Sequence, residues 1–196
     1  MTTRRENTRR RRRPFRDPAT LILIVCGGEA TEPAYFHGLR QHMRNPAIKS
    51  VVSVRPEDPK RVVAFAATRR GDYDQVWCVL DVDEFDYTEA IRSARSAKIE
   101  LAVSNPCFEY WLLLHFENCD AVLTCYRDVE KRLRKHLPSY NKSELRFADY
   151  VEGIGEAVQR ATVRCVDHGA EYRTNPSTGV WRLVEFMASA ASEKRR

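Results

Sequence analysis

The 196-residue sequence lacks the features that mark a membrane or secreted protein. No apolar run approaches the roughly 18 residues that span a bilayer. The charged N-terminus is not followed by a hydrophobic segment of signal-peptide type before Leu21, and the apolar segment that starts there ends at Gly27. We therefore expect a cytoplasmic protein with no membrane partner.

The sequence also lacks the spacings of common metal and nucleotide sites. Its six cysteines are scattered without a CxxC pair, and its five histidines show no ligand spacing, which argues against a zinc site and favours reduced thiols. The glycines at 27 and 28 are not followed by the lysine and hydroxyl residue of a P-loop, so that motif is excluded.

Positive charge is concentrated at one end of the chain. Residues 1–18 hold eight arginines against Glu6 and Asp17, a balance of +6 that equals the formal charge of the whole chain. A run such as Arg9, Arg10, Arg11, Arg12 and Arg13 cannot pack into a core and is attracted to polyanions, chiefly through release of counterions from phosphates. The segment is either a nucleic-acid-binding tail or a solubilising leader, and the two interpretations carry equal weight.

The hydrophobic pattern predicts an α/β fold in one domain. Expected strands at 21–26, 50–56, 76–80 and 98–105 alternate with expected helices at 32–44, 60–70, 87–97 and from Pro106. Short crossovers of this kind give a parallel sheet with right-handed connections. We expect a disordered arginine-rich tail at 1–18 and a single domain at 19–196, in which 19–118 form the α/β core and 119–196 a helical appendage.

Three helices are expected to begin at a capping side chain with a proline close behind. Thr31, Asn105 and Asn175 precede Pro33, Pro106 and Pro176, which suits an N-cap followed by the first helical turn. Exposed amides at such a start can hold a phosphate, so Arg173, next to Asn175, is a candidate phosphate ligand. It is equally consistent with an ordinary surface residue.

Acidic side chains follow the expected strands at their carboxyl ends, where ligands collect in open parallel sheets. Asp81 and Asp83 project to the same side of an extended backbone, and two adjacent carboxylates suit Mg²⁺, or Mn²⁺ in its place. Alternatively they end a strand and cap the next helix. Glu29 and Glu32 follow the first strand and either add oxygen ligands or, for Glu32, simply favour the helix dipole.

Three further side chains are candidates with less support from spacing. Glu109 lies one turn into the expected helix after Pro106 and either assists a metal site or faces solvent. His115 falls beside core positions and fits a buried structural histidine better than a catalyst. Lys142 is a cation that either faces the site or lies on the surface.

In their order along the chain, "GEATEPAYF", "DVDEFD", "SNPCFEYWLLLHF" and "NPSTGVWRLVEF" resemble the RloB-like family over most of residues 20–190. The resemblance implies a Toprim-like fold, with a four-stranded parallel sheet, flanking helices and a C-terminal helical region. It implies a Mg²⁺-dependent endonuclease for RNA, tRNA in particular, or for DNA, acting as the toxic effector of bacterial anti-phage defence. The implied partners are an ATPase of the AAA or ABC type encoded nearby and, in a homodimer, a second copy of the chain.

One position departs from the family pattern. The glutamate that usually leads the motif after the first strand, and would be a metal ligand or general base, falls on Gly27. Three explanations stay open: an engineered inactivating change, transfer of the role to Glu29 or Glu32, or loss of catalysis. The alternative function is therefore a non-catalytic nucleic-acid-binding or regulatory subunit that docks on the partner ATPase.

Overall fold

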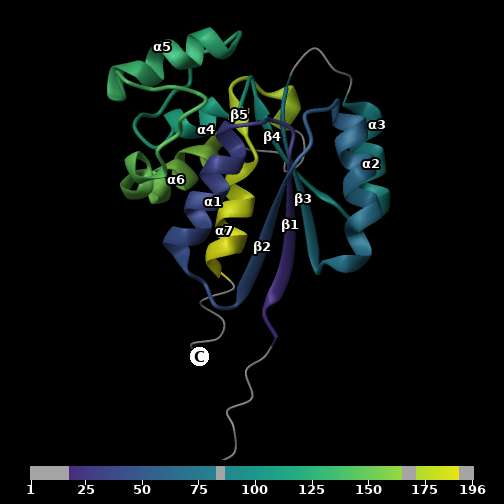
Figure 1. Ribbon diagram of the computed structural model, residues 1–196. Coiled ribbons are helices and arrows are strands. Elements are labelled where there is room, and N and C mark those ends of the chain that lie inside the picture. The colour runs from purple at the N-terminus through teal and green to yellow at the C-terminus, as the bar shows by residue number, and fades with distance from the viewer. Residues whose placement is uncertain (1–17, 83–86, 165–170, 190–196) are drawn as a thin grey trace, which may run out of the picture.

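The computed structural model describes residues 18–82, 87–164 and 171–189. Within them, a five-stranded sheet with the strand order β2-β1-β3-β4-β5 carries helices on both faces (Figure 1). The strands, with their bounds, are β1 (Thr20–Cys26), β2 (Ile48–Val54), β3 (Gln75–Asp81), β4 (Glu100–Asn105) and β5 (Ser177–Thr178). Strands β1 to β4 are parallel, whereas β5 pairs with β4 in the antiparallel direction.

The α-helices divide between the two faces and the upper end of the sheet in Figure 1. Their bounds are α1 (Thr31–Met43), α2 (Pro59–Arg69), α3 (Thr88–Ala97), α4 (Glu109–Leu113), α5 (Tyr126–His136), α6 (Ile154–Arg164) and α7 (Val180–Ser189). Four short 3₁₀ turns lie between them, at η1 (Arg70–Asp72), η2 (Phe147–Asp149), η3 (Val151–Gly153) and η4 (Glu171–Arg173). None of the described helices is long and apolar enough to cross a membrane.

The alternation of apolar side chains along the strands builds two cores. Ile22 and Ile24 point into a large core shared with α1, α4, α5, α6 and α7, while Leu23 and Val25 point into a smaller core under α2 and α3. Neighbouring strand residues face opposite sides of a sheet, so a run without polar residues, such as β1, must be covered on both faces. The sheet is therefore buried between two helical layers, as the apolar strands predict.

The predicted sheet of four strands is wrong by one strand. The strand that was not predicted is β5, which has two residues and comes from the C-terminal region that was expected to be helical throughout. Gly179 N–H donates to Val103 O at 2.8 Å and continues this pairing beyond β5. A two-residue strand carries no hydrophobic alternation, and for this reason the sequence pattern did not indicate it.

The three predicted N-caps are wrong for a shared reason, which is that each side chain has a partner elsewhere. Helix α1 begins at Thr31 itself, with Ala30 in the cap position, and α4 and α7 begin three or more residues after their prolines. Asn175 donates to Asn105 Oδ1 at 2.9 Å and also bonds the backbone of Leu123. Both asparagines precede cis prolines and join the carboxyl end of β4 to the C-terminal region.

Candidate functional site

The candidate site lies where the strand order changes direction. From β1 the chain passes through α1 to β2 on one side, and from β2 it passes through α2 to β3 on the other side of β1. The connections therefore diverge between β1 and β3, with α1 and α2 on opposite faces (Figure 1). Ligands of open α/β sheets bind in the crevice at such a point, outside the carboxyl ends of the strands.

Gly28 leaves room at this point for the carboxylate of Glu32. A β-carbon at residue 28 would lie 2.0 Å from Glu32 Oε2 and 2.3 Å from Oε1, so any side chain there would displace the carboxylate. Glu32 is in the first turn of α1 and is only 3% exposed. The helix start and the bare glycine together fix this carboxylate above the end of β1.

Burial raises the pKa of Glu32, and the nearby Glu109 carboxylate raises it further. Backbone hydrogen bonds, including one from Gly28, and the charge of Lys142 oppose this shift without cancelling it. Glu32 consequently holds its proton to a higher pH than an exposed glutamate does.

Replacing Glu32 with glutamine is expected to stabilise the protein at pH 8 and to have no such effect near pH 4. The folded state binds the Glu32 proton more tightly than the unfolded state, so ionisation destabilises the fold as the pH rises. At pH values below the pKa that Glu32 has in the unfolded chain, Glu32 is protonated in both states, and the glutamine substitution no longer adds stability. Thermal unfolding midpoints across this pH range measure the difference. Glu29→Gln, at an exposed position, is the matched control, and an equal effect of Glu32→Gln at both pH values would contradict the prediction.

Glu109 is the most deeply buried acid of the site. It is 0% exposed, and its Oε1 lies 3.3 Å from both Thr31 Oγ1 and Tyr140 Oη and 3.5 Å from Lys142 Nζ. Its Oε2 is buried and accepts no hydrogen bond from a nitrogen or oxygen of the described residues, and the neighbouring group that interacts with the carboxylate is the weakly donating Cys107 thiol. Leaving a buried carboxylate oxygen unpaired costs free energy, and such atoms need an explanation such as a catalytic role or an absent ion.

Lys142 reaches the site from the loop after α5. Thr31 Oγ1 lies 3.2 Å from Lys142 O, and the ammonium group lies 5.1 Å from the ring centre of Tyr126. Burial alone would lower the pKa of Lys142, but the surrounding acidic groups, led by Glu109 and Asp81, outweigh it and raise the pKa. Lys142 is therefore a half-exposed cation that faces the acidic cluster, and the nearby carboxylates favour its protonated form.

Asp81 is the last residue of β3 and lies within the electrostatic reach of Lys142. Tyr87, just before α3, donates its hydroxyl to the backbone oxygen of Asp81 and so holds the end of the strand. Asp83 lies outside the described residues. We call Glu32, Asp81, Glu109 and Lys142 the acidic cluster.

Gly27 directly follows β1, and a side chain at this position would lie on the side of the sheet opposite the acidic cluster. A β-carbon at this position would lie 3.3 Å from Leu80 Cδ2 and 3.4 Å from Val79 O, and Leu80 belongs to the core under α2 and α3. Glu109 and Asp81 instead act on Lys142 on the opposite side. A glutamate at residue 27 would thus start from the α2 side and reach the acidic cluster only around the end of the strand.

The side chains present suit Mg²⁺ in their chemistry, because carboxylate oxygens are its usual protein ligands. The unpartnered Glu109 Oε2 is the atom that most favours a missing cation. No three Asp, Glu, His or Cys side chains within the described residues converge closely enough to hold a metal ion by themselves. A complete metal centre would need a contribution from Asp83 or a rearrangement on binding.

The structure separates the other candidates from the acidic cluster. Glu29 is exposed and makes no hydrogen bond or ion pair with a described residue, and Arg173 is exposed beside the ring of Tyr172. His115 is buried between Tyr35 Oη at 3.1 Å and Trp111 O at 3.0 Å, and burial lowers its pKa to about 4. It is a structural histidine that stays neutral. Residues 9–13 lie outside the described part of the chain.

Sequence reasoning missed the residues that build the surroundings of the acidic cluster. Thr31 and Tyr140 bind Glu109, and Gly28 accommodates Glu32. Two thiols, Cys26 and Cys107, lie close by, and burial together with the nearby carboxylates raises their pKa, so they are not nucleophiles. The five cysteines in the described residues are all free.

The fold and the acidic cluster define a class: an α/β protein with acidic side chains gathered at the carboxyl ends of a mostly parallel sheet. The family model described as "RloB-like protein" matches residues 22–187, and the chain belongs to the RloB-like family. No curated protein and no solved structure matches the chain in the other two comparisons.

Proposed function

We propose that the chain is a Mg²⁺-dependent endonuclease that cleaves RNA, with tRNA as the first candidate, at the acidic cluster. The observation that carries the proposal is Glu109, a fully buried carboxylate at the β1–β3 crevice with one unpartnered oxygen and a protonated lysine 3.5 Å from the other. A set of acids and one cation suits a site that handles both a metal ion and a phosphate.

The chain's own residues take distinct parts in this proposal. Asp81, Asp83 and the unpartnered Glu109 Oε2 would hold the ion, which would stabilise negative charge on the phosphate and polarise a water. Lys142 binds a phosphate oxygen and neutralises its charge. Glu32, with its raised pKa, accepts a proton nearer to neutral pH than an ordinary glutamate does. Thr31 and Tyr140 position Glu109, which in turn orients Lys142.

Membership of the RloB-like family adds expectations that we keep as part of the proposal. The nuclease would act as the toxic effector of a bacterial anti-phage defence system, in partnership with an ATPase of the AAA or ABC type. DNA is the competing substrate. We keep the Toprim-like arrangement as the proposed description of the fold and the homodimer as the expected assembly.

A second candidate function is a non-catalytic subunit that binds nucleic acid and docks on the ATPase. Two observations favour it: Gly27 has no carboxylate, and the described acids do not converge into a metal site on their own. In this case the acidic cluster is a remnant that Lys142 partly neutralises.

Cleavage assays on the full chain distinguish the two functions. Total RNA, purified tRNA and plasmid DNA are incubated with the unmodified chain and with Gly27→Glu, in Mg²⁺, Mn²⁺ or EDTA, with and without the partner ATPase. Gly27→Ala is the matched control, because it adds the same β-carbon against Leu80 without a carboxylate.

The proposed nuclease predicts metal-dependent cleavage by the unmodified chain, unchanged or increased in Gly27→Glu. Cleavage by Gly27→Glu alone would assign Gly27 as an inactivating residue in an otherwise intact site. Absence of cleavage under every condition, with all three proteins folded, would favour the binding subunit.

A further inference from the structure

One long stretch of the chain is entirely free of acidic residues. Residues 33–56 contain no aspartate or glutamate but include four cations, Arg40, Arg44, Lys49 and Arg55. In the structure this stretch forms most of α1 and all of β2. Charge is thus segregated along one side of the fold, although the body of the protein is close to neutral.

The four cations surround the β2 edge of the sheet, with Arg40 and Arg44 from α1 on one face and Lys49 and Arg55 of the β2 segment on the α2 side. Strand β2 is the last strand on its side among the described residues, and Val51 and Val54 are 41% and 39% exposed there. Arg55 N–H donates to Cys26 O, and Thr20 N–H donates to Ala47 O. The odd-numbered residues of β2 therefore bond to β1, and the even-numbered residues turn their backbone groups to the open edge. Arg40 Nη1 donates to one of these, Ser50 O, at 3.1 Å.

None of the four cations is ion-paired with a described residue, whereas many other exposed cations of the fold are. Arg55 is the clearest example. Its guanidinium lies 3.9 Å from the ring centre of Phe65, and its buried Nε has no hydrogen-bond partner in the described chain. A cation that is fixed in place and unneutralised is ready to bind an external anion.

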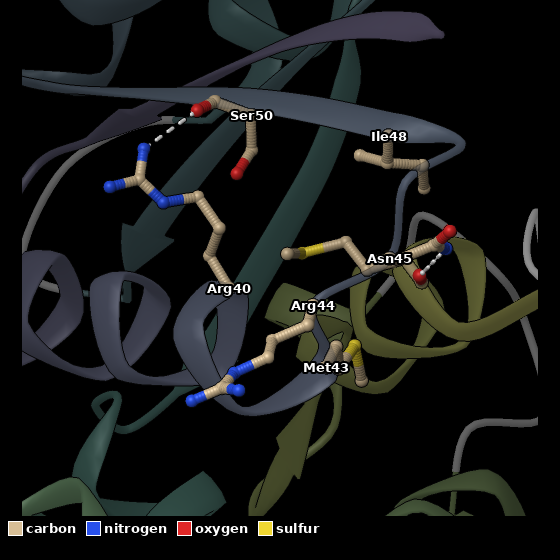
Figure 2. Close-up of a pocket in the computed structure, with 7 residues that line it drawn as sticks. Arg40, Met43, Arg44, Asn45, Ile48 and Ser50 are labelled. Atoms are coloured by element: carbon tan, nitrogen blue, oxygen red, sulfur yellow. Dashed lines mark hydrogen bonds between the residues drawn. The ribbon is translucent and has the colours of Figure 1, made fainter.

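A cavity of about 150 Å³ adds an uncharged donor to this edge. Figure 2 shows Arg40 reaching up to β2 and the hydroxyl of Ser50 directed toward the same space, with Arg44 pointing away from the strand. Ser50 is 4% exposed, and its Oγ has no partner among the described residues. Met43 and Ile48 form the apolar side of the cavity.

The β2 edge runs toward the carboxyl ends of the strands, where the Arg55 side chain lies on the α2 side of the sheet, opposite the acidic cluster. The Arg55 N–H bond to Cys26 O places Arg55 beside Gly27, at the carboxyl end of β1. At the other end of β2, Ile48 pairs with Thr20, the first residue of β1, and the arginine-rich residues 9–13 precede that strand in the chain.

We propose that Arg40, Arg44, Lys49 and Arg55, which we call the β2-edge patch, bind the phosphate backbone of the nucleic-acid substrate along this edge of the sheet. The inference rests on the proposed function for the identity of the polymer. The patch contacts phosphates and not bases, so it contributes affinity without sequence preference. Its charge complements a polyanion, and the acidic cluster would repel one unless cations are present.

Binding of fluorescently labelled tRNA and single-stranded RNA, measured in EDTA as a function of salt, tests the patch independently of cleavage. The test variant is the full chain with Arg40→Gln, Arg44→Gln, Lys49→Gln and Arg55→Gln. The matched control changes Lys60, Arg61, Arg69 and Arg134 to glutamine, since these cations are exposed and each is already paired with an acid. Both variants lose the same net charge.

The patch variant is expected to bind about 10-fold more weakly at moderate salt. The slope of log K against log salt concentration should fall by roughly 3, because each of the four lost phosphate contacts contributes about 0.7–0.9. The control is expected to bind like the unmodified chain. Equal affinity and slope for the two variants would overturn the proposal. Lys49→Glu, which removes no described hydrogen bond, must weaken binding as well, and this excludes misfolding as the cause. If the patch variant loses binding while no protein cleaves, the patch stands and the nuclease proposal fails.

Discussion

Replacing Asp81 with asparagine is expected to lower nucleic-acid cleavage by roughly 10³-fold, the size of effect seen when a group that stabilises the transition-state charge is removed. Asp81 ends β3 at the crevice and is one of the acids that act on Lys142. Its backbone oxygen would keep the hydrogen bond from Tyr87, so the strand end should stay in place. Single-turnover cleavage of tRNA in Mg²⁺ measures the loss.

Two controls accompany the Asp81→Asn measurement. Asp72→Asn changes an exposed aspartate in η1 and should leave cleavage unchanged. RNA binding in EDTA should be the same for Asp81→Asn and the unmodified chain, because the proposed phosphate contacts lie on the β2-edge patch. Retained cleavage in Asp81→Asn would place the reaction elsewhere in the protein.

Acidification from pH 6.5 to pH 4 is expected to remove about 3 kcal/mol of stability through His115. Burial lowers the pKa of His115 from 6.5 to about 4, so between these values the unfolded chain binds a proton that the folded chain does not. The free energy of unfolding then falls as the pH falls. His115→Gln should lack this part of the pH dependence.

Urea denaturation at several pH values measures the contribution of His115. The variant should be less stable than the unmodified chain at pH 7, because it disturbs the contacts with Tyr35 and Trp111, and the difference should narrow or reverse by pH 4.5. His42→Gln, at an exposed histidine, should follow the pH profile of the unmodified chain. Parallel profiles for His115→Gln and the unmodified chain would show that the pKa of His115 is the same in the folded and unfolded states, which contradicts the prediction.

Much of the fold is readable from the sequence because the strands are apolar and covered on both faces. The strands β1 to β4 and the helices between them lie within a few residues of their predicted positions, and the RloB-like family is confirmed. The sheet is nevertheless mixed and has five strands, since Ser177 and Thr178 pair with β4 through contacts that no local pattern encodes. The same long-range contacts explain why Asn105 and Asn175 bond each other and cap no helix.

The candidate site was predictable in its location but not in its surroundings. The ends of β1 and β3 were expected to meet, and they do, so that Glu32 and Asp81 both act on Lys142. Spacing left open whether Glu109 faces solvent, and the structure shows it completely buried under a loop more than 25 residues further along the chain. Spacing also did not reveal that residue 27 faces α2, because the side on which a strand residue lies depends on register within the sheet.

The central claim is that the carboxylates at the β1–β3 crevice bind a divalent cation. The most direct test is thermal unfolding of the full chain in increasing Mg²⁺, at ionic strength held constant with NaCl, for the unmodified chain and Asp81→Asn. Binding to the folded state predicts a saturable rise in the unfolding midpoint, equivalent to about 1.4 kcal/mol at ten times the dissociation constant. The rise should be absent in Asp81→Asn. No stabilisation of the unmodified chain by Mg²⁺ or Mn²⁺, or equal stabilisation of the two proteins, would contradict the claim.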